Sequence, residues 1–239
     1  MLRDHRLILA TIVALLLSWS EAGAAAGTVK YRYDAAGRLS AADYDNGLSI
    51  NYAYDPAGNV IDVTIGPPLP SAYSRDYVQK SYVAYYGRPA DPAGQNYWAG
   101  RMDAEGHSLN GIIGAFGNSD EFNRRYGGLS YTDLVTRIYQ QTLGRNPDPA
   151  GLAYYVGELQ AGRRTLQSIT LDVLNGATTA PDSTVVANKL DVAAYYTSKV
   201  AAGCPYGTEQ QGLNAVSGVT AVAATVTAAK AAIAGRCGP

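Results

Sequence analysis

The chain has 239 residues, of which 19 are Lys or Arg and 20 are Asp or Glu, so its formal net charge is −1 at pH 7. This near-neutral composition argues against nucleic acid or an anionic membrane surface as the main partner, because binding to either needs a basic footprint. The length allows one domain of ordinary size and a smaller appendage.

The N-terminus predicts a secretory signal peptide over residues 1–26. Arg3 and Arg6 supply a positive n-region, an apolar h-region follows, and cleavage is expected after Ala24 or Ala26. The apolar run is short for a membrane span, and an uncleaved anchor helix is the alternative. We therefore expect a secreted, periplasmic or cell-surface protein without a membrane span after signal cleavage.

Residues 28–65 predict a small antiparallel β-meander. Apolar and polar residues alternate in four segments, which are Thr28–Tyr33, Arg38–Tyr44, Leu48–Tyr54 and Val60–Ile65. Turn signals separate these segments, and one of them is Asn46-Gly47, the strongest short hairpin signal.

A short repeat lies within the predicted meander. The segment Tyr33-Asp34-Ala35-Ala36-Gly37-Arg38-Leu39 matches Tyr54-Asp55-Pro56-Ala57-Gly58-Asn59-Val60, which begins 21 residues later. It resembles the tyrosine-aspartate (YD) repeats of RHS-type cell-surface and toxin proteins, in which many repeats build a large β-shell. Two repeats cannot close a shell, so we expect this sheet to pack on the helices, pair with a partner or be partly mobile.

A proline-rich linker over residues 66–74 follows, and a helical repeat domain is expected over residues 75–236. Residues 76–118 align without a gap to residues 133–175, 57 positions later, with 15 of 43 residues identical. Such a repeat predicts two copies of one supersecondary unit that pack on each other. The last helix is expected to be rich in Ala, Val and Thr and to carry Val216 through Ile233.

The residue types at the repeated positions are typical of helix caps, helix ends and packing contacts rather than of catalytic groups. They are Gly87, Arg88, Asp91, Pro92, Gly94, Tyr97 and Trp98 in the first copy, and Gly144, Arg145, Asp148, Pro149, Gly151, Tyr154 and Tyr155 in the second. The glycines after each first helix are predicted to end it, and each Asp-Pro pair is predicted to cap and open the next helix.

Two further roles are expected within this motif. Arg88 and Arg145 are predicted to bind exposed helix C-terminal carbonyls or the aspartate of the next loop. Trp98 and Tyr155 are predicted to lie in the core, near the interface between the two copies.

The double motif Gly-Arg-x-x-Asp-Pro-Ala-Gly resembles the domain-of-unknown-function 4214 family over roughly residues 72–235. That resemblance implies an all-helical fold found in secreted and surface proteins, and no activity is established for the family. The fold class is therefore predicted as mainly α, with two internal repeats preceded by a small β-meander.

The two cysteines, Cys204 and Cys237, predict a disulfide that closes the helical domain, because an even pair in an exported chain reads first as a bridge. Two free thiols are the alternative.

Catalytic residues are not predicted. His107 is the single His after residue 26, and a polar position before a short helix explains it. Asp120, Glu121 and Asp172 could in principle supply a carboxylate pair for glycoside hydrolysis, but nothing in their spacing selects one. No cofactor is expected, and calcium at Asp91 and Asp148 is the open alternative.

The residues together predict an exported, non-enzymatic structural or adhesive module that binds a cell-surface protein or glycan. The alternative is a carbohydrate-binding or carbohydrate-active protein that uses carboxylates and the 19 tyrosines of the chain. Tyr suits both a thin core whose edges meet water and a sugar-binding surface.

Overall fold

The computed structural model describes residues 28–45, 48–66 and 69–237. The predicted signal peptide, the Asn46-Gly47 turn and part of the proline linker lie outside these ranges. The chain divides into two compact units, residues 1–69 and residues 70–239, and each is described by itself.

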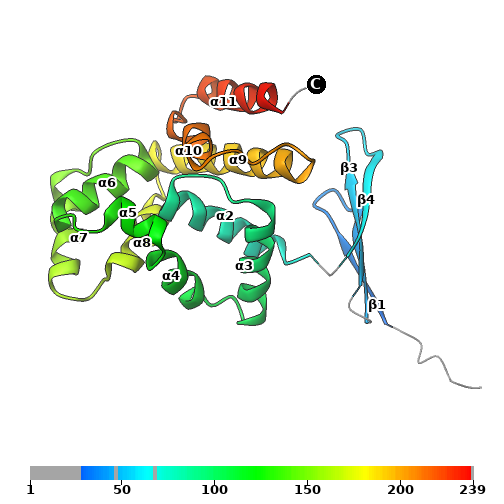
Figure 1. Ribbon diagram of the computed structural model, residues 1–239, viewed down its shortest axis with the longest axis horizontal. Helices are drawn as coiled ribbons and strands as arrows, with labels where there is room; N and C mark the ends of the chain where they lie inside the picture. Colours follow the sequence, from blue (N-terminus) through cyan, green and yellow to red (C-terminus); the bar gives the residue numbers. More distant parts are fainter. Residues whose placement is uncertain (1–27, 46–47, 67–68, 238–239) are drawn as a thin grey trace, which may run out of the picture. The chain divides into compact units, whose positions relative to one another are not determined.

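The first unit contains a four-stranded antiparallel sheet in the order β1-β2-β3-β4 (Figure 1). The strands are β1 Val29–Tyr33, β2 Leu39–Tyr44, β3 Ser49–Tyr54 and β4 Val60–Gly66. Strands that follow each other in the chain are paired, so the predicted meander is confirmed.

The aspartates of the short repeat hold two equivalent hairpin turns. Asp34 Oδ1 accepts a hydrogen bond of 2.8 Å from the N–H of Arg38, and Asp55 Oδ1 accepts one of 2.8 Å from the N–H of Asn59. Gly37 takes a φ of 77° in the first turn, which a residue without Cβ adopts at little cost. The repeat is therefore a β-hairpin whose turn is closed by its own aspartate.

The second unit is helical. Its helices are α2 Ala72–Tyr86, α3 Pro92–Ala104, α4 Asn110–Gly117, α5 Asp120–Tyr126, α6 Tyr131–Leu143, α7 Pro149–Gln160, α8 Leu166–Gly176, α9 Asp182–Ala201, α10 Glu209–Ser217 and α11 Ala223–Arg236. Helices α2, α3 and α4 form the first copy of the repeat, and α6, α7 and α8 form the second. The mainly α fold predicted from the sequence is confirmed.

The two copies pack on each other, as the gapless repeat predicts. Helix α4 packs against α8, and α2 packs against both α6 and α8. Helix α9 then packs against α2 and α6, and it carries α10 and α11 on its other side (Figure 1). The C-terminal helices therefore form a layer over the repeat pair.

Tyrosine supplies much of the core of this unit. Tyr85, Tyr126 and Tyr196 are among its largest fully buried side chains. A buried phenol needs a partner for its hydroxyl, and Tyr85 donates to the backbone oxygen of Gln167 at 2.6 Å. That bond joins α2 to α8, so it also ties one copy of the repeat to the other.

Two element boundaries differ from the predictions. Helix α2 begins at Ala72, three residues before the predicted start of the helical domain at 75, because the hydroxyl of Ser71 accepts a hydrogen bond of 3.1 Å from the N–H of Ser74. The predicted single C-terminal helix is two helices, α10 and α11. Between them the Thr220 hydroxyl accepts from the N–H of Val222, a local bond that competes with helix formation.

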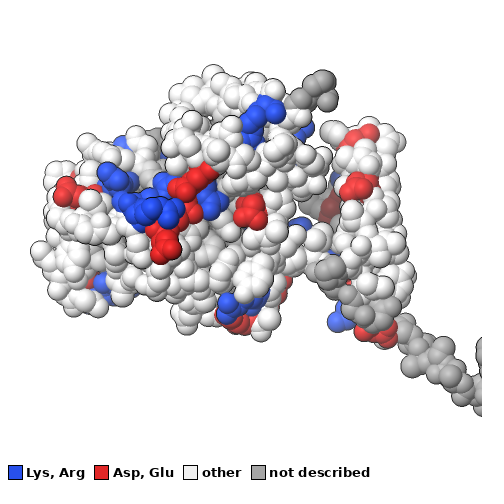
Figure 2. Space-filling view, in the orientation of Figure 1, with Lys and Arg blue, Asp and Glu red and all other residues white. Residues whose placement is uncertain are grey.

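Charged side chains are sparse and of mixed sign. Figure 2 shows basic and acidic groups side by side on a surface that is mostly uncharged. One such cluster joins α5 to α10, where Glu209 pairs with Arg124 at 3.4 Å and with Arg125 at 2.9 Å. No extended basic face is present on the side that Figure 2 shows.

Candidate functional site

The repeated motif forms the same helix junction twice. Gly87 and Gly144 end α2 and α6 in the left-handed conformation, with φ of 63° and 70°. Both helices therefore stop at the residue that the sequence predicts, since a residue without Cβ adopts this conformation most easily.

Asp91 and Asp148 are the N-caps of α3 and α7, which confirms that prediction. Asp91 Oδ1 accepts a hydrogen bond of 2.7 Å from the N–H of Gly94, and Asp148 Oδ1 accepts one of 2.9 Å from Gly151. The bond from Gly151 lowers the pKa of Asp148. Each carboxylate that was considered for calcium is therefore engaged by the backbone of its own helix.

A tyrosine hydroxyl from the preceding helix reaches the same place. A Cβ added at Gly94 would collide with the hydroxyl oxygen of Tyr82, and one added at Gly151 would lie 2.9 Å from that of Tyr139. The second glycine of the motif is therefore explained by close approach of a ring, rather than by backbone conformation.

The motif arginines lie over the same rings and bind acidic groups far along the chain. The Arg88 guanidinium is 5.2 Å from the Tyr82 ring centroid, and that of Arg145 is 5.3 Å from the Tyr139 centroid. Each arginine also donates to the backbone oxygen of the next residue. These contacts are equivalent in the two copies.

The carboxylate partners correct the prediction for these arginines. Arg88 forms two hydrogen bonds with Glu121, of 2.9 and 2.8 Å, and Arg145 forms two with Asp182, of 2.9 and 2.6 Å. The partners are not the aspartates of the next loop, because those carboxylates already cap helices. Instead they come from α5 and from the first residue of α9, the elements that follow each copy.

The Arg88–Glu121 pair is less exposed to solvent than the Arg145–Asp182 pair. The side chains of Arg88 and Glu121 are each 15% exposed, whereas that of Arg145 is 40% exposed. Tyr206 gives Arg88 a further hydrogen-bond partner. Its hydroxyl accepts from Arg88 at 2.8 Å and donates to the backbone oxygen of Pro89 at 2.6 Å.

The aromatic pairs of the motif divide into an exposed and a half-buried ring. Tyr97 and Tyr154 are 59% and 56% exposed, while Trp98 and Tyr155 pack beneath them at centroid distances of 5.2 and 5.0 Å. Trp98 and Tyr155 are predicted to be core residues, but they are partly buried side chains that pack against the core rather than members of it. Each ring contacts an aromatic side chain of its own copy, Phe116 for Trp98, and stays partly open to solvent.

His107 belongs to a polar cluster between the start of α2 and the end of α3. The Ser74 hydroxyl donates to Asp103 Oδ1 at 2.5 Å and lies 3.2 Å from His107 Nδ1, and Asp103 also accepts from the backbone and hydroxyl of Ser71. Burial alone would raise the pKa of Asp103, but these hydrogen bonds keep it below its usual value.

This cluster contains the three residue types of a serine hydrolase in a different arrangement. In a hydrolase triad the serine donates to the histidine, whose other nitrogen faces the carboxylate. Here Ser74 and His107 both face the same oxygen of Asp103, and Ser74 is fully buried. The cluster thus fastens α2 to α3.

A buried lysine connects three helices. Lys189 of α9 is 2% exposed and donates to the backbone oxygen of Gln141 in the last turn of α6 at 2.5 Å. The Gln141 side chain donates in turn to the backbone oxygen of Ala84 in the last turn of α2. Burial lowers the pKa of Lys189 from 10.5 to about 8. The burial of Lys189 could not be predicted from the sequence, because a charged residue on a helix is expected to be exposed.

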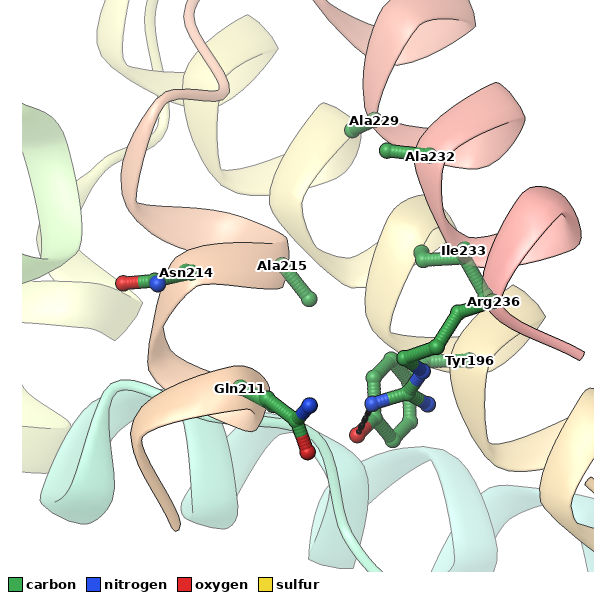
Figure 3. A pocket seen from close by; sticks show the side chains of 8 residues that line it. All are labelled: Tyr196, Gln211, Asn214, Ala215, Ala229, Ala232, Ile233 and Arg236. Atoms are coloured by element: carbon green, nitrogen blue, oxygen red, sulfur yellow. Dashed lines mark hydrogen bonds between the residues drawn. The ribbon is translucent and has the colours of Figure 1, made fainter. Parts of the chain in front are cut away.

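The predicted disulfide is present between Cys204 and Cys237. Next to it a cleft of about 180 Å³ opens between α10 and α11 (Figure 3), lined by Tyr196, Gln211, Asn214, Ala215, Ala229, Ala232, Ile233 and Arg236. Arg236 donates to the Tyr196 hydroxyl at 2.7 Å and to the backbone oxygen of Tyr206 at 3.2 Å. Its guanidinium is therefore held by the protein rather than presented to a ligand.

Among the described residues, no group of three or more His, Cys, Asp or Glu is placed to hold a metal ion. Of the helices that the structure describes, none combines the length and the apolar character that crossing a bilayer requires.

Comparison with protein families agrees with this organisation. Comparison with curated proteins and with solved structures gave no significant match. The RHS Repeat model matches residues 33–66, which run from the last residue of β1 through β2, β3 and β4. Residues 71–121 and 113–177, which together carry both copies of the arginine motif, match the family described as Domain of unknown function (DUF4214). Both predicted resemblances are therefore confirmed, but the DUF4214 match ends at residue 177, whereas the prediction extends to about 235.

Proposed function

We propose that this protein is an exported, non-enzymatic structural or adhesive module of the cell envelope or the extracellular space. The N-terminal pattern of residues 1–26 and the Cys204–Cys237 disulfide support export, since disulfides persist in oxidising compartments. The matches to an RHS repeat and to DUF4214 are consistent with an extracellular or structural module.

The observation that carries this proposal is how the repeated polar groups are used. Asp91 and Asp148 cap helices, and Arg88 and Arg145 are paired with carboxylates of later elements. All four therefore support internal contacts of the helical unit. The polar groups that the two copies share are thus used to hold the helices together, which supports a structural role.

The repeated motif also presents one tyrosine ring per copy to solvent, in addition to the exposed Tyr73 on α2 and Tyr131 on α6, and this supports contact with a cell-surface protein or glycan. Tyr97 and Tyr154 occupy equivalent positions and are each more than half exposed. An exposed ring supported by a second ring offers a flat face to a sugar or to an apolar protein surface.

A glycan array and a pull-down from cell-surface extracts, each with calcium and with chelator, test this proposal. The double variant Tyr97→Ala/Tyr154→Ala is expected to lose binding, whereas the control Tyr131→Ala, 45% exposed but outside the motif, is expected to keep it. Binding that survives the double variant would contradict the aromatic surface.

The carbohydrate-active alternative has its own test. The protein is incubated with a panel of polysaccharides and with peptidoglycan, and no product release is expected from the wild type or from His107→Ala. Release that disappears when one carboxylate, such as Asp172, is replaced by its amide would overturn the non-enzymatic proposal.

A further inference from the structure

The two hairpins of the sheet are identical in register. In the first hairpin Lys30 pairs with Asp43 and Arg32 with Ala41, and 21 residues later Asn51 pairs with Thr64 and Ala53 with Asp62. Both hairpins also carry a register shift at the same place, before Tyr33 in one and before Tyr54 in the other. The sheet is thus one hairpin unit used twice, joined where β2 pairs with β3.

The described sheet begins and ends with strands that pair on one side only. β1 and β4 are its two edges. All but the last residue of β4 is exposed, and its apolar side chains Val60, Ile61, Val63 and Ile65 are 50%, 65%, 51% and 72% exposed. Proteins usually protect an edge strand with lysine, proline or a covering element, whereas β4 carries one charged residue, Asp62.

We infer that β4 pairs with β1 of a second copy of this chain, in the register that joins β2 to β3 within one copy. In that internal junction Ala41 pairs with Asn51, Ala42 with Ile50 and Asp43 with Ser49. The repeat of 21 residues makes β4 equivalent to β2, and β1 equivalent to β3. The outer edge of β4 therefore has the hydrogen-bonding pattern that β2 uses, and β1 has its complement.

The equivalent residues across this new junction are complementary. Moving each pair by 21 residues places Asp62 opposite Lys30, Val63 opposite Val29 and Thr64 opposite Thr28 of the second copy. Opposite charges, β-branched pairs and threonine pairs are all favourable cross-strand neighbours. The charged pair falls on one face of the sheet and the valine pair on the other, since side chains alternate along a strand.

The two faces support the same alignment. Tyr31 and Ile65, on the face that carries the valine pair, are 59% and 72% exposed, and Lys30 and Asp62 on the opposite face are exposed as well. Joining the copies in this register would extend both the apolar face and the polar face of the sheet. A slip of one residue would instead turn the apolar side chains of the added strand to the polar face. The occupant is therefore a second copy rather than an unrelated strand.

This junction uses different surfaces of the two copies, so it leaves one edge strand free on each. We expect association that grows with concentration through a series of sizes, and it does not depend on the proposed function. Sedimentation velocity of the purified full chain over a wide concentration range measures it. The wild type is expected to associate, and Asp62→Lys, which places Lys against Lys30, is expected to raise the midpoint concentration by about tenfold.

Asp62→Asn and Lys30→Gln should each weaken association, and the double variant Asp62→Asn/Lys30→Gln should weaken it no further than either single change does, because both changes remove the same charged pair. The control Asp191→Lys makes the same charge change on the helical unit, at a side chain that is 55% exposed, and should associate as the wild type does. Far-UV circular dichroism checks that each variant is folded. A wild type that is monomeric throughout, a double variant whose loss is the sum of the two single losses, or a control that weakens equally would each overturn the inference.

Discussion

Gly94→Ala tests the close approach of a tyrosine to the Asp-Pro helix start. Ala is the better helix former by up to about 1 kcal/mol, so propensity alone predicts a gain in stability. The added Cβ would collide with the Tyr82 hydroxyl and lie 2.8 Å from Asp91 Oδ2. The Tyr82 ring is 6% exposed and lies against Tyr86 and Phe116, so it has little room to move away.

Overpacking of this kind costs about 1–3 kcal/mol, which exceeds the propensity gain. We therefore expect Gly94→Ala to lower the free energy of unfolding by about 1–2 kcal/mol, or Tm by roughly 2–8 °C for a unit of this size. Gly157→Ala in α7 is the matched control, because a Cβ there meets no atom within 4 Å, and it should stabilise the protein slightly.

Tyr82→Phe removes the colliding hydroxyl and completes a double-mutant cycle with Gly94→Ala. When Tyr82→Phe is already present, Gly94→Ala should cost less than about half of what it costs in the wild type, as measured by urea unfolding. If Gly94→Ala stabilises as much as Gly157→Ala does, or if Tyr82→Phe gives no relief, the close approach is not what requires glycine here.

Three further outcomes are expected. Burial lowers the pKa of Lys189 from 10.5 to about 8, so between these two values the unfolded state holds the proton and the folded state does not. The free energy of unfolding therefore rises with pH across this window. Lys189→Met should abolish a rise of about 2 kcal/mol in unfolding free energy between about pH 7 and pH 9.5, and an unchanged rise would place its source elsewhere. Cys204→Ser should cost roughly 4 kcal/mol by opening the disulfide loop, measured as the shift in urea midpoint that reduction reproduces in the wild type but not in the variant. Arg88→Lys should destabilise by about 2 kcal/mol and Arg145→Lys by less than about 1 kcal/mol, since the first pair is the more buried, and equal losses in thermal unfolding would contradict that ranking.

Local signals explain most of what could be predicted from the sequence. Gly87 and Asp91 act within one turn of helix, so their roles follow from neighbouring residues alone. The β-meander could be predicted from the alternation of apolar and polar residues and from the turn residues between the segments. The disulfide could be predicted because the chain has two cysteines. These features need no knowledge of how the helices pack.

Contacts between distant elements could not be predicted in this way. Arg88 finds Glu121 33 residues later and Arg145 finds Asp182 37 residues later, so the spacing of 57 between the copies does not carry over to their partners. The burial of Lys189 depends on the crossing of α9 over α6, which no local pattern reveals. The partial exposure of Trp98 could not be predicted for the same reason, because whether a large ring is covered depends on the neighbouring helices.

The two arginine pairs have a consequence for how such arrays lengthen. Each copy is fastened by a carboxylate that belongs to the segment after it, first Glu121 on α5 and then Asp182 on α9. The arginine and its tyrosine ring are therefore the same in both copies, whereas the carboxylate that pairs with the arginine differs in residue type and in the helix that supplies it. The carboxylate that pairs with the arginine can therefore be a Glu on a short helix or an Asp at the start of a long one. One copy of the repeat can thus be joined to different following elements through the same arginine, provided that the following element supplies a carboxylate.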